Sequence, residues 1–144
     1  MKRIILLLSL TFSFNLFAAD YQQEINKFFE LYKKDKIDEA VDSIYSSNEY
    51  VSAIPDQIKN VKTQLNALKG MVGQVHHIGQ LDTFLVGESF VYVTYLATYD
   101  RQPVRYEFQF FKVKDGWRIY SFSFDDDLSE IQNQARKAAW SAKK

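Results

Sequence analysis

The sequence predicts an α+β fold in which N-terminal helices pack on a curved antiparallel four-stranded sheet, with a C-terminal helix after the sheet. Apolar residues in the first half recur at intervals of three and four, which is typical of helices with one buried face. After residue 71 the apolar pattern changes to that of strands, and hairpin-length links join the strands. Short links require antiparallel pairing, so helices followed by this meander predict an α+β domain.

The helices are predicted over residues 21–46 and 55–69, with a short turn at 49–53. The charged stretch 33–36 marks a bend or break in the first segment. Pro55 suits the first position of the next helix, and Gly70 is a natural C-terminal stop. The apolar positions that define the buried faces are Ile25, Phe28, Phe29, Tyr32, Ile37, Ala40, Val41, Ile44, Tyr45, Ile58, Val61, Leu65 and Leu68.

Four strands are predicted over residues 72–85, 89–99, 104–114 and 117–124. Gly79 interrupts the first strand, and we expect a bulge there that curves the sheet. Asp115-Gly116 is a strong two-residue hairpin signal. A final helix is predicted over residues 128–142, where Asp127 and Glu130 have the spacing of an N-terminal capping pair.

The two-residue turn predicts the register of the last hairpin, with Lys114 opposite Trp117. One sheet face then carries Phe108, Phe110, Trp117 and Ile119, and the other carries Phe111, Val113, Tyr120, Phe122 and Phe124. Apolar and polar residues alternate only near Arg105, Glu107 and Gln109.

A sheet that is apolar on both faces needs another element packed against each face. The N-terminal helices supply one. We expect the second face to pack against the tail helix, a second subunit or a ligand. A homodimer through the sheet is the preferred interpretation. The alternative is that the tail helix and ordinary surface aromatics account for the second face.

The start of the chain predicts the compartment. Lys2 and Arg3 precede an apolar run over residues 4–17, and Ala18 and Ala19 follow it. This layout is typical of a secretory signal peptide. We predict a signal peptide over residues 1–18, a single domain over 19–144, and a periplasmic or secreted protein without a stable membrane anchor. Cleavage after Ala18 is preferred to cleavage after Ala19. Because the chain has no cysteine, lipoprotein acylation, disulfides and thiol chemistry are excluded.

The charge balance excludes one class of partner. Removal of Lys2 and Arg3 leaves 16 basic and 18 acidic residues, a net charge of −2. A nearly neutral chain without a basic run has no electrostatic means of holding nucleic acid. Nine Tyr and twelve Phe instead indicate thick apolar surfaces.

Few polar residues suggest chemistry. His76 and His77 are adjacent on a predicted strand, so their side chains point to opposite faces and form a poor metal site. No metal and no cofactor are predicted. The candidates for acid–base catalysis are His77 and Asp82, each acting with a tyrosine. Asp125, Asp126 and Asp127 are interpreted as a solvated strand end, because the run lacks the glycine turn and distal Glu of a calcium loop. The candidate residues for binding an apolar ligand are Tyr92, Tyr95, Tyr106, Phe108, Phe110 and Trp117.

The order of elements, ending in the hairpin Lys114-Asp115-Gly116-Trp117-Arg118-Ile119, resembles the nuclear transport factor 2-like superfamily with its cone-shaped, cystatin-like fold. The resemblance covers residues 21–127, and the tail helix has no counterpart in it. It implies a pocket between the helices and the concave sheet. The superfamily hosts many functions, so the fold does not choose one.

Three functions remain open from the sequence. A non-catalytic envelope protein that binds a small apolar ligand or a protein partner is preferred, because polar catalytic groups are scarce. The first alternative is a small isomerase or dehydratase that uses a pocket His or Asp with Tyr. The second is a component of an envelope or secretion assembly.

Overall fold

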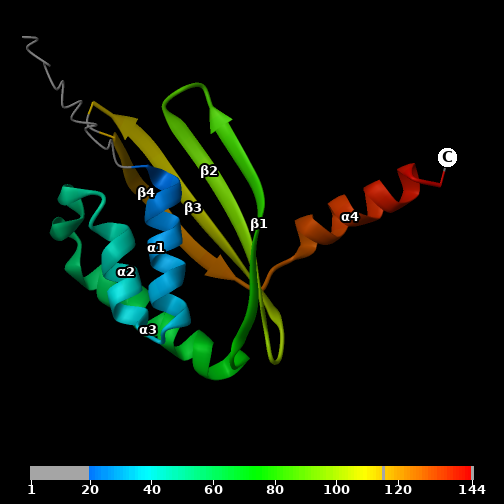
Figure 1. The fold of residues 1–144 in the computed structure, drawn as a ribbon, viewed down its shortest axis with the longest axis horizontal. Helices are drawn as coiled ribbons and strands as arrows, with labels where there is room; N and C mark the ends of the chain where they lie inside the picture. Colours follow the sequence, from blue (N-terminus) through cyan, green and yellow to red (C-terminus); the bar gives the residue numbers. More distant parts are fainter. Residues whose placement is uncertain (1–19, 115, 144) are drawn as a thin grey trace, which may run out of the picture.

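The α+β prediction is confirmed. A computed structural model describes residues 20–114 and 116–143. The elements, in chain order, are α1 (Tyr21–Lys33), α2 (Ile37–Tyr45), the 3-10 helix η1 (Glu49–Ala53), α3 (Pro55–Val72), β1 (Val75–Val86), β2 (Phe90–Tyr99), β3 (Pro103–Val113), β4 (Gly116–Asp125) and α4 (Ser129–Ser141) (Figure 1). The predicted signal peptide lies outside the described residues. Within those residues, no helix combines the length and hydropathy that crossing a membrane requires.

The predicted break between the first two helices lies at Asp35. This residue has φ 64°, and the flanking backbone closes α1. The Asp35 N–H donates to the Tyr32 carbonyl at 3.1 Å, and the Lys36 N–H donates to the Leu31 carbonyl at 3.0 Å. These two bonds form a Schellman motif, which satisfies carbonyls at the end of the helix. The chain therefore turns back, and α2 packs beside α1.

The predicted stop at Gly70 is wrong. The helix α3 continues to Val72, and the residue that follows it is Gly73, with φ 89°. A Cβ atom at Gly70 would have open space around it, whereas one at Gly73 would lie 2.5 Å from Asp100 Oδ2. Gly73 is therefore the position where the turn from α3 into β1 needs a glycine.

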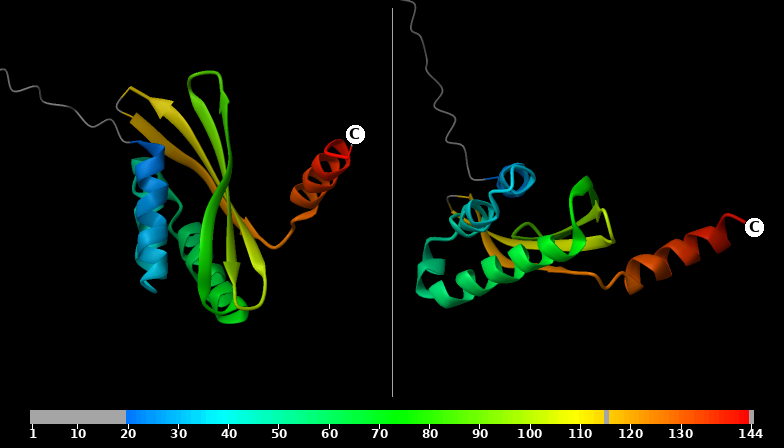
Figure 2. Two further views of the ribbon diagram at one scale, coloured as in Figure 1. Left: turned by 45° about the vertical axis from the view of Figure 1, so that its right-hand side comes forward. Right: turned by 90° about the horizontal axis from the view of Figure 1, so that it is seen from below.

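The sheet is an antiparallel meander in the order β1-β2-β3-β4. In β1 the register shifts between Val75 and His77 and again between Gln80 and Asp82. The irregularities thus flank Gly79 rather than lying at it, and they fit the curved, twisted strand visible in Figure 2. The helices α1 and α2 lie on one side of the sheet, and α4 extends away from the body (Figure 2).

The predicted register of the last hairpin is wrong. Val113 pairs with Gly116 and Lys112 pairs with Trp117. A further shift, between Gln109 and Phe110, leaves Tyr120 without a paired residue on β3. Beyond this bulge Phe122 lies opposite Phe108 rather than facing away from it, with the two ring centroids 5.0 Å apart.

The core lies between the helices and one face of the sheet and is largely aromatic. Phe28 on α1 is fully buried. Its ring packs 5.5 Å from that of Phe108 and 5.0 Å from that of Phe122. Tyr21, at the start of α1, packs edge-on against Trp117 at 5.2 Å. Because Phe122 turns inward, the core holds more aromatic surface, and the other face of the sheet less, than the sequence predicts.

Three buried tyrosines from α1, β2 and β3 meet at one end of this core. The Tyr99 hydroxyl donates to the Tyr32 hydroxyl at 2.9 Å and lies 2.5 Å from the Tyr106 hydroxyl. Burial raises the pKa of both Tyr99 and Tyr106, because a phenolate would lose its hydration there. These hydroxyls therefore remain protonated and hydrogen-bonded in the folded protein.

We expect alkaline unfolding above about pH 10, the pKa of a tyrosine in an unfolded chain. A group whose pKa is raised by folding contributes stability below its unfolded pKa, and this stability is lost as pH rises toward the folded pKa. Tyrosinate absorbance and near-ultraviolet circular dichroism, followed in one pH titration, should show part of the tyrosines ionising together with loss of structure. Tyr120→Phe, at an exposed position, should leave the midpoint unchanged. Complete tyrosine ionisation with the dichroism intact would contradict the expectation.

Candidate functional site

The sheet face turned away from α1, α2 and α3 is the outer face. Alternate residues of β2 point to it, and they are half-buried while their neighbours are buried. The face has little cover, since none of the residues of α4 is buried. Several large apolar side chains are exposed on it, with Phe84 64% and Tyr120 69% exposed.

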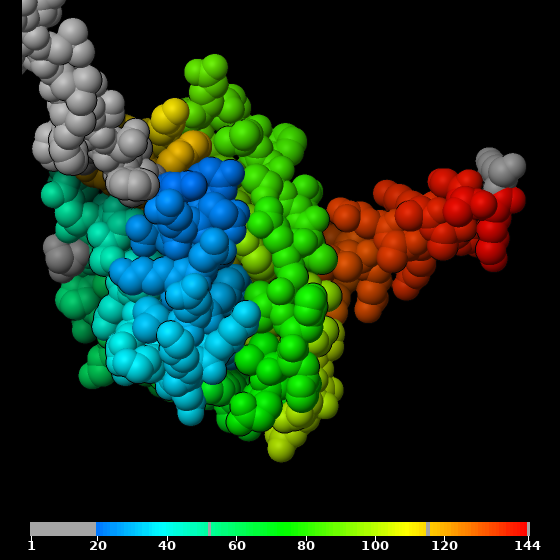
Figure 3. Space-filling view, in the orientation of Figure 1, coloured from blue at the N-terminus to red at the C-terminus, as the bar shows by residue number. Residues whose placement is uncertain are grey.

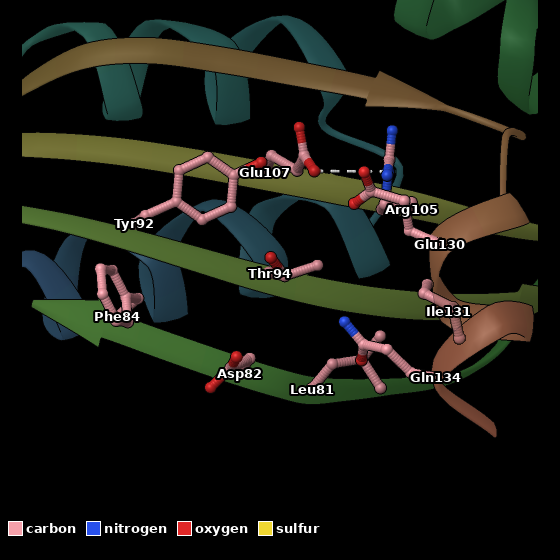
Figure 4. Close-up of a pocket in the computed structure, with 10 residues that line it drawn as sticks. All are labelled: Leu81, Asp82, Phe84, Tyr92, Thr94, Arg105, Glu107, Glu130, Ile131 and Gln134. Atoms are coloured by element: carbon pink, nitrogen blue, oxygen red, sulfur yellow. Dashed lines mark ion pairs between the residues drawn. The ribbon is translucent and has the colours of Figure 1, made fainter. Parts of the chain in front are cut away.

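A pocket of about 170 Å³ lies on the outer face, beside the first turns of α4. Figure 4 shows it as a cleft with β1, β2 and β3 forming the floor and α4 closing one end. The lining residues are Leu81, Asp82, Phe84, Tyr92, Thr94, Arg105, Glu107, Glu130, Ile131 and Gln134.

Arg105 on β3 is the central charge of the pocket. Its side chain is only 15% exposed, and its Nη2 donates to Asp125 Oδ2 at 3.0 Å. This hydrogen bond, more than any other interaction, raises the pKa of the guanidinium. Glu107 Oε1 lies 3.4 Å from Nε, yet the buried Nε has no hydrogen-bond acceptor among the described residues. Glu107 therefore balances the charge of Arg105 without satisfying the Nε–H, which the surrounding side chains shield from solvent.

Tyr92 on β2 provides a second polar group in the pocket. Desolvation raises the pKa of its phenol, and the hydrogen bond to Glu107 raises it further. The phenol therefore stays protonated and directs its proton toward the Glu107 carboxylate. The Tyr92 ring forms part of the apolar wall together with Phe84, which lies opposite it on β1.

The two residues predicted for acid–base catalysis lie on the outer face, away from the space between helices and sheet. Asp82 lines the pocket, is exposed, and accepts the Thr83 N–H at 2.8 Å. His77 pairs with Thr98 near the start of β1 and is not among the residues that line the pocket.

His76 forms a different contact, which the sequence did not predict. Its Nε2 lies 2.6 Å from Asp100 Oδ1, and Asp100 Oδ2 accepts the Gln74 N–H at 2.7 Å. The backbone bond from Gln74, followed by the bond to His76, lowers the pKa of Asp100. Both side chains are exposed, and the arrangement ties the start of β1 to the β2–β3 turn. Within residues 20–114 and 116–143, no three His, Asp or Glu side chains cluster in a way that would hold a metal ion.

Most residues predicted to bind a ligand lie in the core. Tyr106, Phe108 and Phe110 are fully buried, and Trp117 is half-buried against α1. The Tyr95 hydroxyl accepts from Gln22 Nε2 at 2.7 Å and donates to Gln80 Oε1 at 2.9 Å. Aromatic side chains thus pack the space between helices and sheet where the resemblance implies a pocket.

A groove of about 240 Å³ is present between α1 and β1, and it includes part of the Tyr95 side chain. Its rim is polar, and its lining residues are Asn26, Phe29, Glu30, Lys33, Ile78 and Tyr95.

Tyr92 and Asp82 are the predicted site residues that line the outer pocket. Sequence reasoning missed Arg105 and Glu107 as site residues. A signal for them was present, since Arg105, Glu107 and Gln109 are the one stretch of the sheet with clear polar alternation. The contribution of α4 had no comparable signal.

Comparison with family models, with curated proteins and with solved structures found no match to this chain.

Proposed function

We propose that this is a non-catalytic periplasmic or secreted protein that binds a small apolar ligand in the outer pocket. The observation that carries the proposal is the outer pocket itself, where the apolar side chains of Leu81, Phe84 and Ile131 lie beside the largely buried charge of Arg105. Ligand sites combine apolar walls with polar groups that orient the ligand, and this pocket contains side chains of both kinds.

The size and charge of the pocket restrict the ligand. Its volume of about 170 Å³ is below the roughly 300–1,000 Å³ of sites that enclose drug-sized molecules. Asp82, Glu107 and Glu130 surround the single cation Arg105, so a carboxylate ligand would meet repulsion. We therefore propose a compact, uncharged apolar group with one hydrogen-bond acceptor.

Benzyl alcohol is a suitable probe, with toluene and benzoate as comparisons. Amide chemical-shift titration should show binding at the outer face in the order benzyl alcohol, then toluene, then benzoate. Leu81→Ser, in the pocket lining, should weaken binding of benzyl alcohol by roughly tenfold, about what loss of one well-packed apolar side chain costs. Shifts confined to another surface, or equal affinity for all three probes, would contradict the proposal.

Leu85→Ser is the matched control for Leu81→Ser. Both leucines lie on β1 and are comparably exposed, at 53% for Leu85 and 46% for Leu81, but Leu85 does not line the pocket. We expect the Leu85 variant to bind benzyl alcohol as the unchanged protein does. An equal loss in both variants would mean that the probe senses general surface hydrophobicity.

The isomerase or dehydratase alternative has weaker support. It would use Asp82 with Tyr92, since these two side chains line the same pocket. Asp82 is exposed, and its carboxylate already accepts a backbone N–H. The phenol of Tyr92 already forms a hydrogen bond with Glu107. Neither group is thereby arranged as an acid or base for a bound substrate.

A further inference from the structure

The two edges of the sheet are protected to different degrees. At the β4 edge, side chains from the segment after α2 form hydrogen bonds with the backbone of Ile119. Ser47 Oγ accepts the Ile119 N–H at 3.0 Å, and Asn48 Nδ2 donates to the Ile119 carbonyl at 2.9 Å. At the other edge, β1 pairs with β2 alone. An unpaired edge is a template for another strand unless charge, proline or bulges protect it.

The far half of β1 lacks these protections. Both register shifts lie before Asp82, and from Asp82 to Val86 the pairing with β2 is regular. This stretch contains no lysine and no proline, and Asp82 is its one charge. Its apolar side chains are exposed, with Phe84 64%, Leu85 53% and Val86 52% accessible. An exposed, regular and apolar edge of this kind favours pairing with a further strand.

The helix α4 extends past this same edge. Its first turns lie against the outer face, and the rest projects from the body on the β1 side (Figures 1 and 3). Beyond Gln134 the helix continues to Ser141, which gives it a reach of roughly 10 Å at 1.5 Å per residue. At about 4.8 Å between strands, that length covers about two strands of a sheet placed beside β1.

The charges of α4 and of the outer face are complementary. The projecting half of α4 carries Arg136 and Lys137, and Lys143 follows the helix. On the β1 side of the sheet, the outer face carries Asp82, and the turn after β1 carries Glu88. The basic half of α4 from another molecule would therefore be attracted electrostatically to the acidic residues of the outer face.

We propose that a second copy of this chain pairs with the free edge of β1, and that α4 of each copy lies over the outer face of the other. An antiparallel pair centred on Phe84 places Asp82 opposite Val86, so the two Asp82 carboxylates are not opposed. The pairing joins two four-stranded sheets into one, and it covers the apolar surface of β1 and α4 together. It goes beyond the ligand-binding proposal and does not depend on it.

The test is sedimentation velocity of the purified protein over a concentration series, together with three variants. The unchanged protein should dimerise. Phe84→Lys places a charge at the centre of the paired edge and should weaken the dimer by roughly tenfold or more. Arg136→Glu combined with Lys137→Glu should also weaken it, and salt should weaken the unchanged dimer because these contacts are electrostatic.

Tyr120→Lys is the matched control. Tyr120 is an aromatic side chain 69% exposed on the same face, but it lies on β4, the far edge, beyond the reach of the partner's helix. We expect it to leave the dimer intact. Equal loss in the Tyr120 and Phe84 variants would indicate a face-to-face dimer and overturn the proposal, as would a monomer at every concentration.

Hydrogen exchange on the unchanged protein provides a test that needs no variant. Amides in the stretch from Thr83 to Val86 should exchange more slowly as protein concentration rises, because the paired edge withdraws them from solvent. Protection of β1 that is independent of concentration would overturn the proposal, including in the event that Phe84→Lys fails to fold.

Discussion

Replacing Phe28 with alanine is expected to lower the free energy of unfolding by about 3–5 kcal/mol, the usual cost of a large-to-small change at a buried aromatic. Phe28 is fully buried at the centre of the contact between α1 and the sheet. Its ring lies within 6.4 Å of those of Phe29, Tyr32, Tyr106, Phe108 and Phe122. Removing it leaves a cavity among stiff rings that cannot collapse to fill it. Chemical denaturation followed by circular dichroism measures the change.

Phe84→Ala is the control, because it makes the same substitution on the outer face. Phe84 is 64% exposed, so its ring buries little apolar area in the folded protein and little stability is lost when it is removed. At a concentration where the chain is monomeric, we expect a change within about 0.5 kcal/mol. Similar losses in both variants would contradict a central position of Phe28 in the contact between α1 and the sheet.

The helices could be predicted closely because their signals are local. The spacing of Ile25, Phe28, Phe29 and Tyr32 is a property of one helical face, and the structure buries all four. The break at residues 33–36 was also predictable, since a run of charged side chains has no place in a buried contact. The residue that ends α3 was not, because Gly70 and Gly73 are equally good stops by local propensity. Only the position of Asp100, from the turn after β2, requires the glycine to be at 73.

The register of the last hairpin shows where local reasoning fails. Asp115-Gly116 favours a two-residue loop at those residues, but the structure pairs Val113 with Gly116. The bulge at Tyr120 then lets both Ile119 and Phe122 point into the core, where they are 1% and 7% exposed. Burial of two large side chains outweighs the local turn preference, and the gain depends on the position of α1. The sequence of one hairpin contains no information about the position of α1.

The outer pocket depends even more on distant parts of the chain. Its floor was partly visible in the sequence as the polar alternation at Arg105 and Glu107. Its closed end comes from Glu130, Ile131 and Gln134, which reach it because the chain turns after Asp125. Asp127 contributes to that turn by accepting the Ser129 N–H at 2.9 Å. The N-cap of α4 is Leu128, which has no side-chain capping bond, so the predicted capping role of Asp127 is wrong. The spacing of Asp127 and Glu130 predicted a helix there, but not the direction in which the helix leaves the sheet.

Gly73→Ala is expected to destabilise the protein by about 2 kcal/mol or more, the combined cost of a strained positive φ and a disturbed hydrogen bond. Gly73 has φ 89°, and an added Cβ would lie 2.5 Å from Asp100 Oδ2 and 2.9 Å from Asp100 Cβ. Asp100 would have to move, and its bond to the Gln74 N–H would be lost with it. The link between α3 and β1 would then loosen. Thermal and chemical denaturation measure the loss.

Gly70→Ala provides a control of opposite sign three residues earlier. Gly70 lies inside α3 with open space around its Cα, so alanine should stabilise the helix by about 0.5–1 kcal/mol. A double-mutant cycle then separates the two causes at Gly73. In an Asp100→Ala background the clash with the carboxylate is absent, and Gly73→Ala should cost less, leaving mainly the backbone strain. A cost that is unchanged by Asp100→Ala would assign the whole effect to φ, and a stabilising Gly73→Ala would show that the turn after α3 does not need glycine.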